Sequence, residues 1–210
     1  MPLKLPRGLY ALVDDGVRPE VPVPQKARWA MEGGAKVLQL RLEQTSDRQA
    51  LEWIGEVMAV ARPLGVVVIV NDRVDLCLVG EASGVHLGDD DLPVEVARRV
   101  LGPEAVIGRT TRTAQDIERA RVAGADHVGL GPIFVTRTKQ VEAPSLGVAG
   151  FEAICRTSPL PVVGIAGISL DTIADVARAG AHAAAVASDW LRSGDPVSRV
   201  AALQRAFSAA

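Results

Sequence analysis

The sequence has few cysteines, few aromatic residues and little net charge, and each shortage excludes a class of protein. Its two cysteines, Cys77 and Cys155, lie in apolar stretches without the paired spacing of zinc or redox motifs. We therefore expect both to be reduced core residues. The chain has 23 basic and 25 acidic residues and a formal charge of −2. It lacks the basic surplus that nucleic-acid binding requires, so we predict no nucleic-acid partner.

Long apolar runs are also missing. No window approaches the roughly 20 apolar residues that cross a bilayer, and the N-terminus, MPLKLPRGLY, lacks an apolar signal segment. We therefore predict no membrane partner and a cytoplasmic location. With 48% hydrophobic residues, the 210-residue chain can bury one continuous core. We predict a single domain over residues 1–210, and a homo-oligomer is compatible with this composition.

Eight short runs rich in Val, Ile, Leu and Ala recur along the chain, at the spacing of successive βα units. Most are apolar throughout, as expected for parallel strands buried on both faces. Glycines such as Gly124 are suited to end helices, while Ser46, Thr113 and Ser169 are suited to begin them. The expected strands cover residues 9–13, 36–40, 66–70, 84–87, 105–108, 127–130, 161–165 and 183–187.

Eight βα units fit either a closed barrel or a doubly wound open sheet. A dinucleotide-binding sheet would place a glycine fingerprint after its first strand, but that turn reads Asp14-Asp15-Gly16-Val17. We therefore predict a (β/α)8 TIM barrel, an α/β fold whose active site lies on the loops that follow the strands. Polar residues at the strand ends are then the candidates for chemistry.

Polar residues follow the second and fifth expected strands. Gln39, Arg41 and Glu43 alternate, which directs all three toward one side, at the barrel mouth. Their alternative role is that of a strand end emerging into solvent. The segment from Arg109 to Thr113 holds two arginines and three hydroxyls, which suit anion binding, although arginines before a helix are common on protein surfaces.

Acidic residues follow the third and fourth expected strands. Asp72 and Asp91 come from neighbouring strand ends and could converge on Mg2+, a hard ion that prefers oxygen ligands. The acidic triplet at 89–91 has a second explanation, because negative charge stabilises a helix N-terminus. His86 is either a hydrogen-bonding group of the pocket or a core residue.

Phosphate binding is predicted after the last three strands. The long loop after the sixth strand carries Thr136, Thr138 and Lys139, which suit a lid that holds phosphate oxygens; an ordinary exposed loop is the alternative. Small residues at Gly167 and at 187–188 would let backbone N–H groups approach a phosphate, as barrels often arrange after strands 7 and 8. Packing alone would also explain Gly167.

These motifs together resemble the thiamine phosphate synthase family, over nearly the whole chain from Tyr10 to Leu191. The segments that carry the resemblance are QLR from Gln39, NDR from Asn71, GVHLGDDDLP from Gly84, GLGPIFVTRTK from Gly129 and VVGIAGI from Val162. The resemblance implies a Mg2+-dependent transferase of thiamine biosynthesis. Pyrophosphate would leave the CH2 group of a hydroxymethylpyrimidine, and a thiazole phosphate nitrogen would attack to give thiamine phosphate.

The resemblance also implies roles for individual residues. Asp72 and Asp91 would hold Mg2+ at the pyrophosphate, and the catalytic set would be Arg41, Asn71, Thr110 and Lys139. The remaining positions would bind the two phosphorylated substrates, pyrimidine pyrophosphate and thiazole phosphate. They are Gln39, His86, Gly88, Thr136, Thr138, Gly167, Ala187 and Ser188.

Several residues depart from the family pattern. Synthases usually carry lysine at the position of Glu43, so this acid should weaken pyrophosphate binding unless Arg109 or Arg112 compensates. Gln is usual at Asp89, Ser at Thr110, His at Arg112 and Gly at Ala166. Two alternatives therefore stay open: a thiazole tautomerase, which is a related isomerase that needs no metal, and a noncatalytic barrel that binds phosphorylated ligands.

Overall fold

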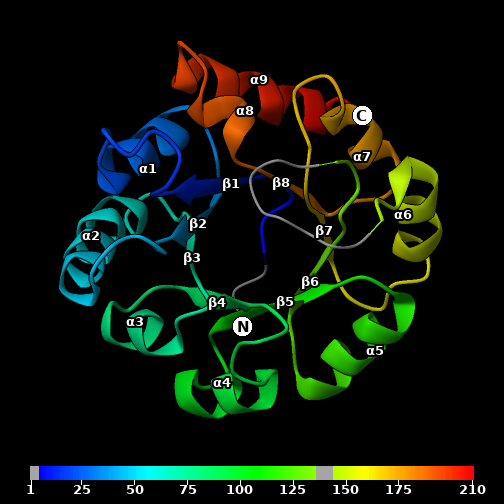
Figure 1. Ribbon diagram of the computed structural model, residues 1–210, viewed down its shortest axis with the longest axis horizontal. Coiled ribbons are helices and arrows are strands. Elements are labelled where there is room, and N and C mark those ends of the chain that lie inside the picture. The colour runs from blue at the N-terminus through cyan, green and yellow to red at the C-terminus, as the bar shows by residue number, and fades with distance from the viewer. Residues whose placement is uncertain (1–4, 136–143) are drawn as a thin grey trace.

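The computed structural model describes residues 5–135 and 144–210. Its strands form a closed parallel barrel in which each strand pairs with its neighbours in sequence order, and β1 pairs with β8. Figure 1 views the barrel along its axis, with the helices in an outer ring. The predicted (β/α)8 TIM barrel is confirmed. The strands are β1 (Gly8–Asp14), β2 (Val37–Arg41), β3 (Val67–Asn71), β4 (Gly84–Leu87), β5 (Val106–Thr111), β6 (His127–Leu130), β7 (Val162–Gly164) and β8 (Ala183–Val186).

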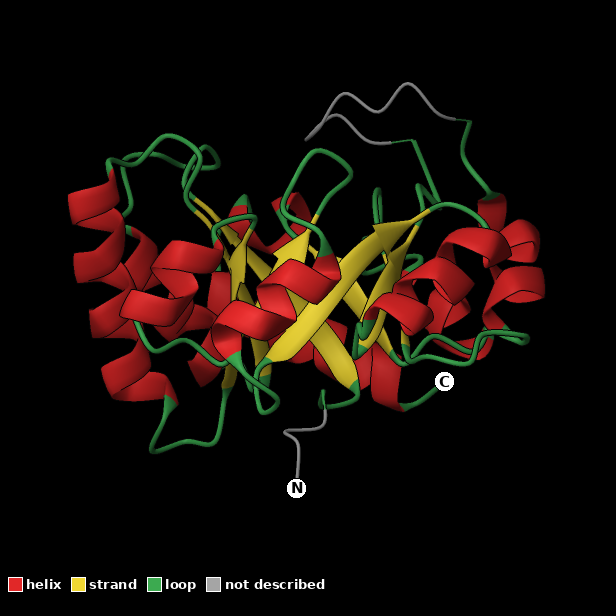
Figure 2. Cartoon of the chain, turned by 90° about the horizontal axis from the view of Figure 1, so that it is seen from below, coloured by secondary structure: helices red, strands yellow, loops and turns green. Residues whose placement is uncertain are grey.

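The helices that follow the strands pack around the outside of the barrel, as the side view of Figure 2 shows. Within the described residues, no helix has the length and apolar composition needed to span a membrane. The helices are α1 (Val23–Glu32), α2 (Asp47–Ala61), α3 (Val74–Val79), α4 (Val94–Leu101), α5 (Ala114–Ala123), α6 (Gly147–Cys155), α7 (Ile173–Arg178), α8 (Ser188–Leu191) and α9 (Pro196–Ser208).

Side chains alternate along the strands between two cores. One set, which includes Leu38, Val68 and Val128, faces outward and packs with the helices. The other set, which includes Tyr10, Ile69 and Val163, fills the inside of the barrel. Because both faces are buried, the strands are apolar throughout, as the sequence pattern indicated. Cys77 and Cys155 are buried free thiols, as expected.

Most predicted element ends lie within a few residues of the observed ones. The Ser46 Oγ accepts a hydrogen bond from the Gln49 N–H at 3.4 Å and begins α2, and Thr113 begins α5 in a capping box with Asp116. The prediction for Ser169 was wrong. Its N–H donates to the Thr172 Oγ1 at 3.0 Å, which closes a turn, and α7 begins after Thr172.

Two further differences affect the barrel mouth. Strand β5 continues to Thr111, three residues beyond the predicted end, because its last residues pair with β6 through Thr111 and Leu130. The short helix α8 begins directly after β8 and was not predicted. Both differences lie at the C-terminal ends of strands, and the first shows that pairing with a neighbouring strand, rather than the apolar pattern, decides how far a strand extends.

Candidate active site

A cavity of about 600 Å3 lies at the C-terminal ends of the strands. It is the place where a TIM barrel carries its active site. Most of the residues predicted from the strand ends line it, although they come from six different strand ends. These lining residues are Gln39, Arg41, Asn71, Asp72, His86, Gly88, Thr110, Gly167, Ala187 and Ser188.

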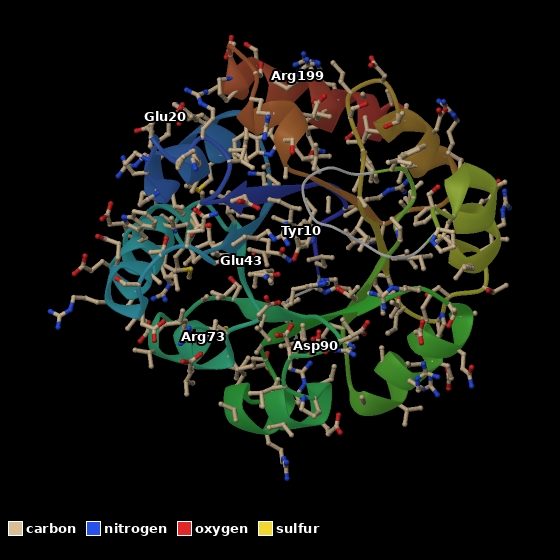
Figure 3. All side chains as sticks on the ribbon, viewed as in Figure 1. Tyr10, Glu20, Glu43, Arg73, Asp90 and Arg199 are labelled. Carbon is tan, nitrogen blue, oxygen red and sulfur yellow. The ribbon has the colours of Figure 1, made fainter. Side chains whose placement is uncertain are left out.

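Strand β2 contributes Gln39 and Arg41 to the cavity, as its alternation predicted. The Gln39 Nε2 donates to the Tyr10 hydroxyl at 3.1 Å inside the barrel, where both side chains are buried. Burial raises the pKa of Tyr10, so this phenol stays protonated at neutral pH. Figure 3 shows Tyr10 near the barrel axis. The inner part of the cavity is therefore polar but uncharged at these two residues.

Arg41 is the last residue of β2 and lies nearer the cavity mouth than Gln39, between two acids. Its Nη1 is 3.4 Å from an Asp14 carboxylate oxygen, and its Nη2 is 3.5 Å from the Glu43 Oε1. The buried Nε has no hydrogen-bond partner within the described residues. The Glu43 side chain is 58% exposed and does not line the cavity. The Arg41 Nε is thus a hydrogen-bond donor in the cavity wall that has no partner within the described residues. The Glu43 carboxylate, which lies outside the cavity, attracts the Arg41 guanidinium and so competes with an anion bound inside.

The loop after β1 is held in place by a buried lysine. Lys26 of α1 is fully buried and donates from Nζ to the Asp14 and Val17 carbonyl oxygens, at 2.9 and 2.7 Å. Asp15 of the same loop accepts from the Gln44 N–H at 2.8 Å. These bonds tie the loops after β1 and β2 together and fix Asp14 beside Arg41.

The two acids predicted to hold Mg2+ lie on adjacent loops. Asp72 lines the 600 Å3 cavity, and its Oδ2 accepts from the Asn71 side-chain amide at 2.7 Å. Asp72 has a φ of 62°, an uncommon conformation for a residue other than glycine, which often marks a functional loop. Asp91 accepts from the Gly88 N–H at 2.5 Å and lines a neighbouring cavity of about 510 Å3.

Asp89 borders both cavities, so they meet at the loop after β4. Within the described residues, no three His, Cys, Asp or Glu side chains gather around one point that could hold a metal ion. A two-carboxylate site remains compatible with this finding, because Mg2+ usually keeps several waters and substrate phosphate oxygens among its ligands. The convergence of Asp72 and Asp91 on one ion stays a prediction.

Asp89 also organises the two arginines of the β5 end. Its Oδ1 is 3.0 Å from the Arg109 Nη2, and its Oδ2 forms an ion pair with Arg112. Arg109 additionally donates to the Gly88 carbonyl oxygen and lies in the smaller cavity, whereas Arg112 borders both. Two departures from the family pattern, Asp89 and Arg112, are thus paired with each other. Asp89 partly neutralises the arginines that could compensate for Glu43.

Strands β4 and β5 place His86 and Thr110 side by side on the cavity wall. The His86 Nε2 and the Thr110 Oγ1 are 2.9 Å apart and share a hydrogen bond. Adjacent to them lies His127, which sequence analysis did not select. Its ring centroid is 5.8 Å from that of His86 and 6.0 Å from that of Tyr10. Its position at the start of β6, rather than at the end, concealed it.

The loop after β7 bends through two left-handed residues, Ala166 and Gly167, with φ values of 72° and 70°. A Cβ on Gly167 would lie 2.7 Å from the Phe134 Cβ and 2.8 Å from the Val135 carbonyl oxygen. The Phe134 N–H also donates to the Ala166 carbonyl at 3.2 Å. Gly167 therefore has a packing role against the loop after β6, in addition to its place in the cavity wall.

Strand β8 leads directly into α8, whose first residue is Ser188. Ala187 and Ser188 both line the cavity, beside the loop after β7. Backbone N–H groups at such a helix start lack partners within the helix, which suits an anion. Asp189, which was not predicted, also lines the cavity and lies 3.6 Å from the Arg199 Nε of α9. The predicted residues Thr136, Thr138 and Lys139 lie outside the described residues.

Comparison with known proteins connects this geometry to one family. The family model described as thiamine monophosphate synthase matches residues 9–189. Thiamine-phosphate synthase of Myxococcus xanthus is 51% identical over 203 residues, which cover 97% of this chain and 93% of the relative. The corresponding protein of Anaeromyxobacter dehalogenans is 47% identical over 202 residues, which cover 96% of this chain and 88% of the relative.

A solved structure gives the same result in three dimensions. Thiamine phosphate pyrophosphorylase from Pyrococcus furiosus superposes with a TM-score of 0.88 at 30% sequence identity, covering 96% of both chains. The family match extends from β1 into α8 and so includes every strand end that lines the cavity. The chain belongs to the thiamine monophosphate synthase family.

Proposed function

We propose that this barrel is a thiamine-phosphate synthase, a transferase that joins hydroxymethylpyrimidine pyrophosphate to thiazole phosphate and releases pyrophosphate. The observation that carries the proposal is the 51% identity to a thiamine-phosphate synthase over nearly the full length of both chains. The arrangement of polar residues around one cavity supports it.

The reaction requires the C–O bond between the pyrimidine CH2 and the pyrophosphate to break, and the electron pair leaves with pyrophosphate. The electron-poor CH2 then accepts the lone pair of the thiazole nitrogen, which forms the new C–N bond. Arg41 is placed to bind the departing anion, since its buried Nε has no partner in the described part of the chain. Asn71 also lines the cavity and orients the Asp72 carboxylate.

Asp72 and Asp91 are the residues that would hold Mg2+. They provide carboxylate oxygens, the ligand type that this ion prefers, on the loops after the neighbouring strands β3 and β4. When bound, the ion would neutralise charge that develops on the pyrophosphate. The chain's own contribution is to position the two substrates and to stabilise charge, which together can supply most of a rate enhancement.

Product analysis provides the direct test. Purified protein is incubated with both substrates, with and without Mg2+, and thiamine phosphate and pyrophosphate are quantified. We expect both products in equal amounts and only with Mg2+. Isomerisation of thiazole phosphate without Mg2+ would instead indicate the tautomerase, and ligand binding without either product would indicate a noncatalytic barrel.

Substitution of the two acids tests the metal site. We expect Asp72→Ala and Asp91→Ala each to lower the Mg2+-dependent rate by at least 100-fold, in the range of losses seen when charge stabilisation of a transition state is removed. Circular dichroism should show an intact barrel for both variants. Full activity in both would reject this metal site.

A further inference from the structure

His127 is a fully buried residue with no hydrogen-bond partner on either ring nitrogen within the described part of the chain. It begins β6 and borders the 600 Å3 cavity. Buried polar groups are almost always hydrogen-bonded, and leaving one without a partner costs free energy. An imidazole in a cavity wall that makes no hydrogen bond to the described protein is therefore suited to form one with a ligand.

A glycine on the neighbouring strand keeps space around this imidazole. Gly108 of β5 pairs in register with both His86 and His127. A Cβ on Gly108 would lie 2.3 Å from the His127 Nε2 and 2.5 Å from the His86 Nδ1. Residue 108 therefore has no room for a side chain, and its absence leaves space for the His86 and His127 rings beside the Gly108 backbone.

The surroundings of His127 favour its neutral form. Burial lowers the pKa of His127 well below 6.5, and the nearby His86 and His182 lower it further. The rings in contact with it are the protonated Tyr10 phenol and the His86 imidazole, and neither carries a negative charge at neutral pH. A neutral imidazole has one N–H donor and one nitrogen acceptor. His127 can therefore both donate to and accept from an uncharged ligand.

Uncharged polar groups lie in the inner part of the cavity, and charged groups lie nearer its mouth. Its inner wall carries Tyr10, Gln39 and His127, which are buried. Partly exposed charges, including Arg41 and Arg112, lie toward the strand ends. An uncharged heterocycle is stabilised by the inner wall, and an attached pyrophosphate by the outer charges. A pyrimidine ring has nitrogen lone pairs that accept from an N–H donor.

We propose that His127 is a substrate-binding residue that hydrogen-bonds the pyrimidine ring of the pyrophosphorylated substrate. This inference rests on the proposed function and assigns one more residue to its substrate. His127 thereby contributes to selection of a nitrogen heterocycle at the inner end of the cavity, while the pyrophosphate is bound separately near the strand ends.

Isothermal titration separates these two contributions. The ligands are hydroxymethylpyrimidine pyrophosphate and inorganic pyrophosphate, each with Mg2+, and the protein is wild type or His127→Phe. We expect about tenfold weaker binding of the pyrimidine ligand to His127→Phe, equivalent to about 1.4 kcal/mol. Binding of inorganic pyrophosphate should be unchanged. Equal affinity of both proteins for the pyrimidine ligand would overturn the inference.

Val128→Ala is the matched control, because Val128 is the next residue of β6 and its buried side chain packs in the outer core, away from the cavity. This variant should lose stability without changing the ratio of the two affinities. A change in that ratio would assign the effect to general loosening of β6 and overturn the role of His127. If wild-type protein does not bind the pyrimidine ligand at all, the proposed function itself fails.

Nitrogen NMR gives a second measurement that does not depend on the folding of His127→Phe. The chain has three histidines, so 15N-histidine labelling yields three pairs of ring signals. Variants at His86 and His182 identify the pair of His127. We expect the pyrimidine ligand, and not inorganic pyrophosphate, to shift this pair. An unchanged pair at saturation would overturn the proposal.

Discussion

Reversal of the charge at Glu43 tests the electrostatics of the cavity mouth. Glu43 lies 3.5 Å from Arg41, the residue expected to contact pyrophosphate, and its side chain is 58% exposed. The charge at residue 43 would therefore interact electrostatically, through water, with a pyrophosphate bound to Arg41. We predict that Glu43→Lys binds pyrophosphate more tightly than the wild type, because repulsion becomes attraction and Arg41 loses a competing partner.

Coulomb's law gives the magnitude. Two unit charges about 6 Å apart in water interact with about 0.7 kcal/mol. Salt near 0.15 M lowers this to about 0.3 kcal/mol. The substitution changes the local charge by two units, and pyrophosphate carries about three, so the gain is about 2 kcal/mol, or about 30-fold in Kd.

Titration calorimetry with pyrophosphate in Mg2+-free buffer, at two salt concentrations, measures this gain. At 1 M salt, screening should reduce the gain to about threefold. The control is Glu20→Lys, which makes the same change in net charge at an acid that pairs with Arg18 and lies toward the outer edge of the barrel in Figure 3. No gain for Glu43→Lys, or an equal gain for Glu20→Lys, would refute the reasoning.

Three further predictions concern stability. Gly55 lies inside α2 with open space around its Cα, so Gly55→Ala should raise the free energy of unfolding in urea by roughly 0.5–1 kcal/mol. In contrast, Gly108→Ala should lower it by about 1–3 kcal/mol, because a Cβ would lie 2.3 Å from the His127 Nε2; unchanged urea midpoints would contradict either prediction. Because the pKa of His127 is lowered in the folded protein, the unfolded chain binds the extra proton below pH 6.5, and stability is lost as pH falls. Urea unfolding at pH 7 and at pH 5 measures this loss of unfolding free energy. We expect the loss to be smaller in His127→Phe than in the wild type, by up to about 2 kcal/mol. Equal losses in the two proteins would argue against a neutral buried imidazole.

The fold was predictable because its signal is local. Strands buried on both faces must be apolar throughout, and this pattern located β4 and β6 at their observed ends, residues 84–87 and 127–130. The polar residues that interrupt the pattern, such as Arg41 and Asp72, stand where strands end. In a parallel barrel all these ends meet at one mouth, so the sequence alone predicted many of the residues that line the cavity there, although not His127 or Asp189.

Closure of the barrel decided the contacts between residues of different strands, because strand register determines which inward side chains lie at the same level of the barrel. His127 begins its strand, yet pairing of β5 with β6 brings it beside Gly108 and into contact with the cavity. The same closure places Asp89 between two arginines and assigns Asp91 to the neighbouring cavity. These contacts join residues far apart in the chain, and no local pattern encodes them, since their geometry depends on how neighbouring strands are aligned.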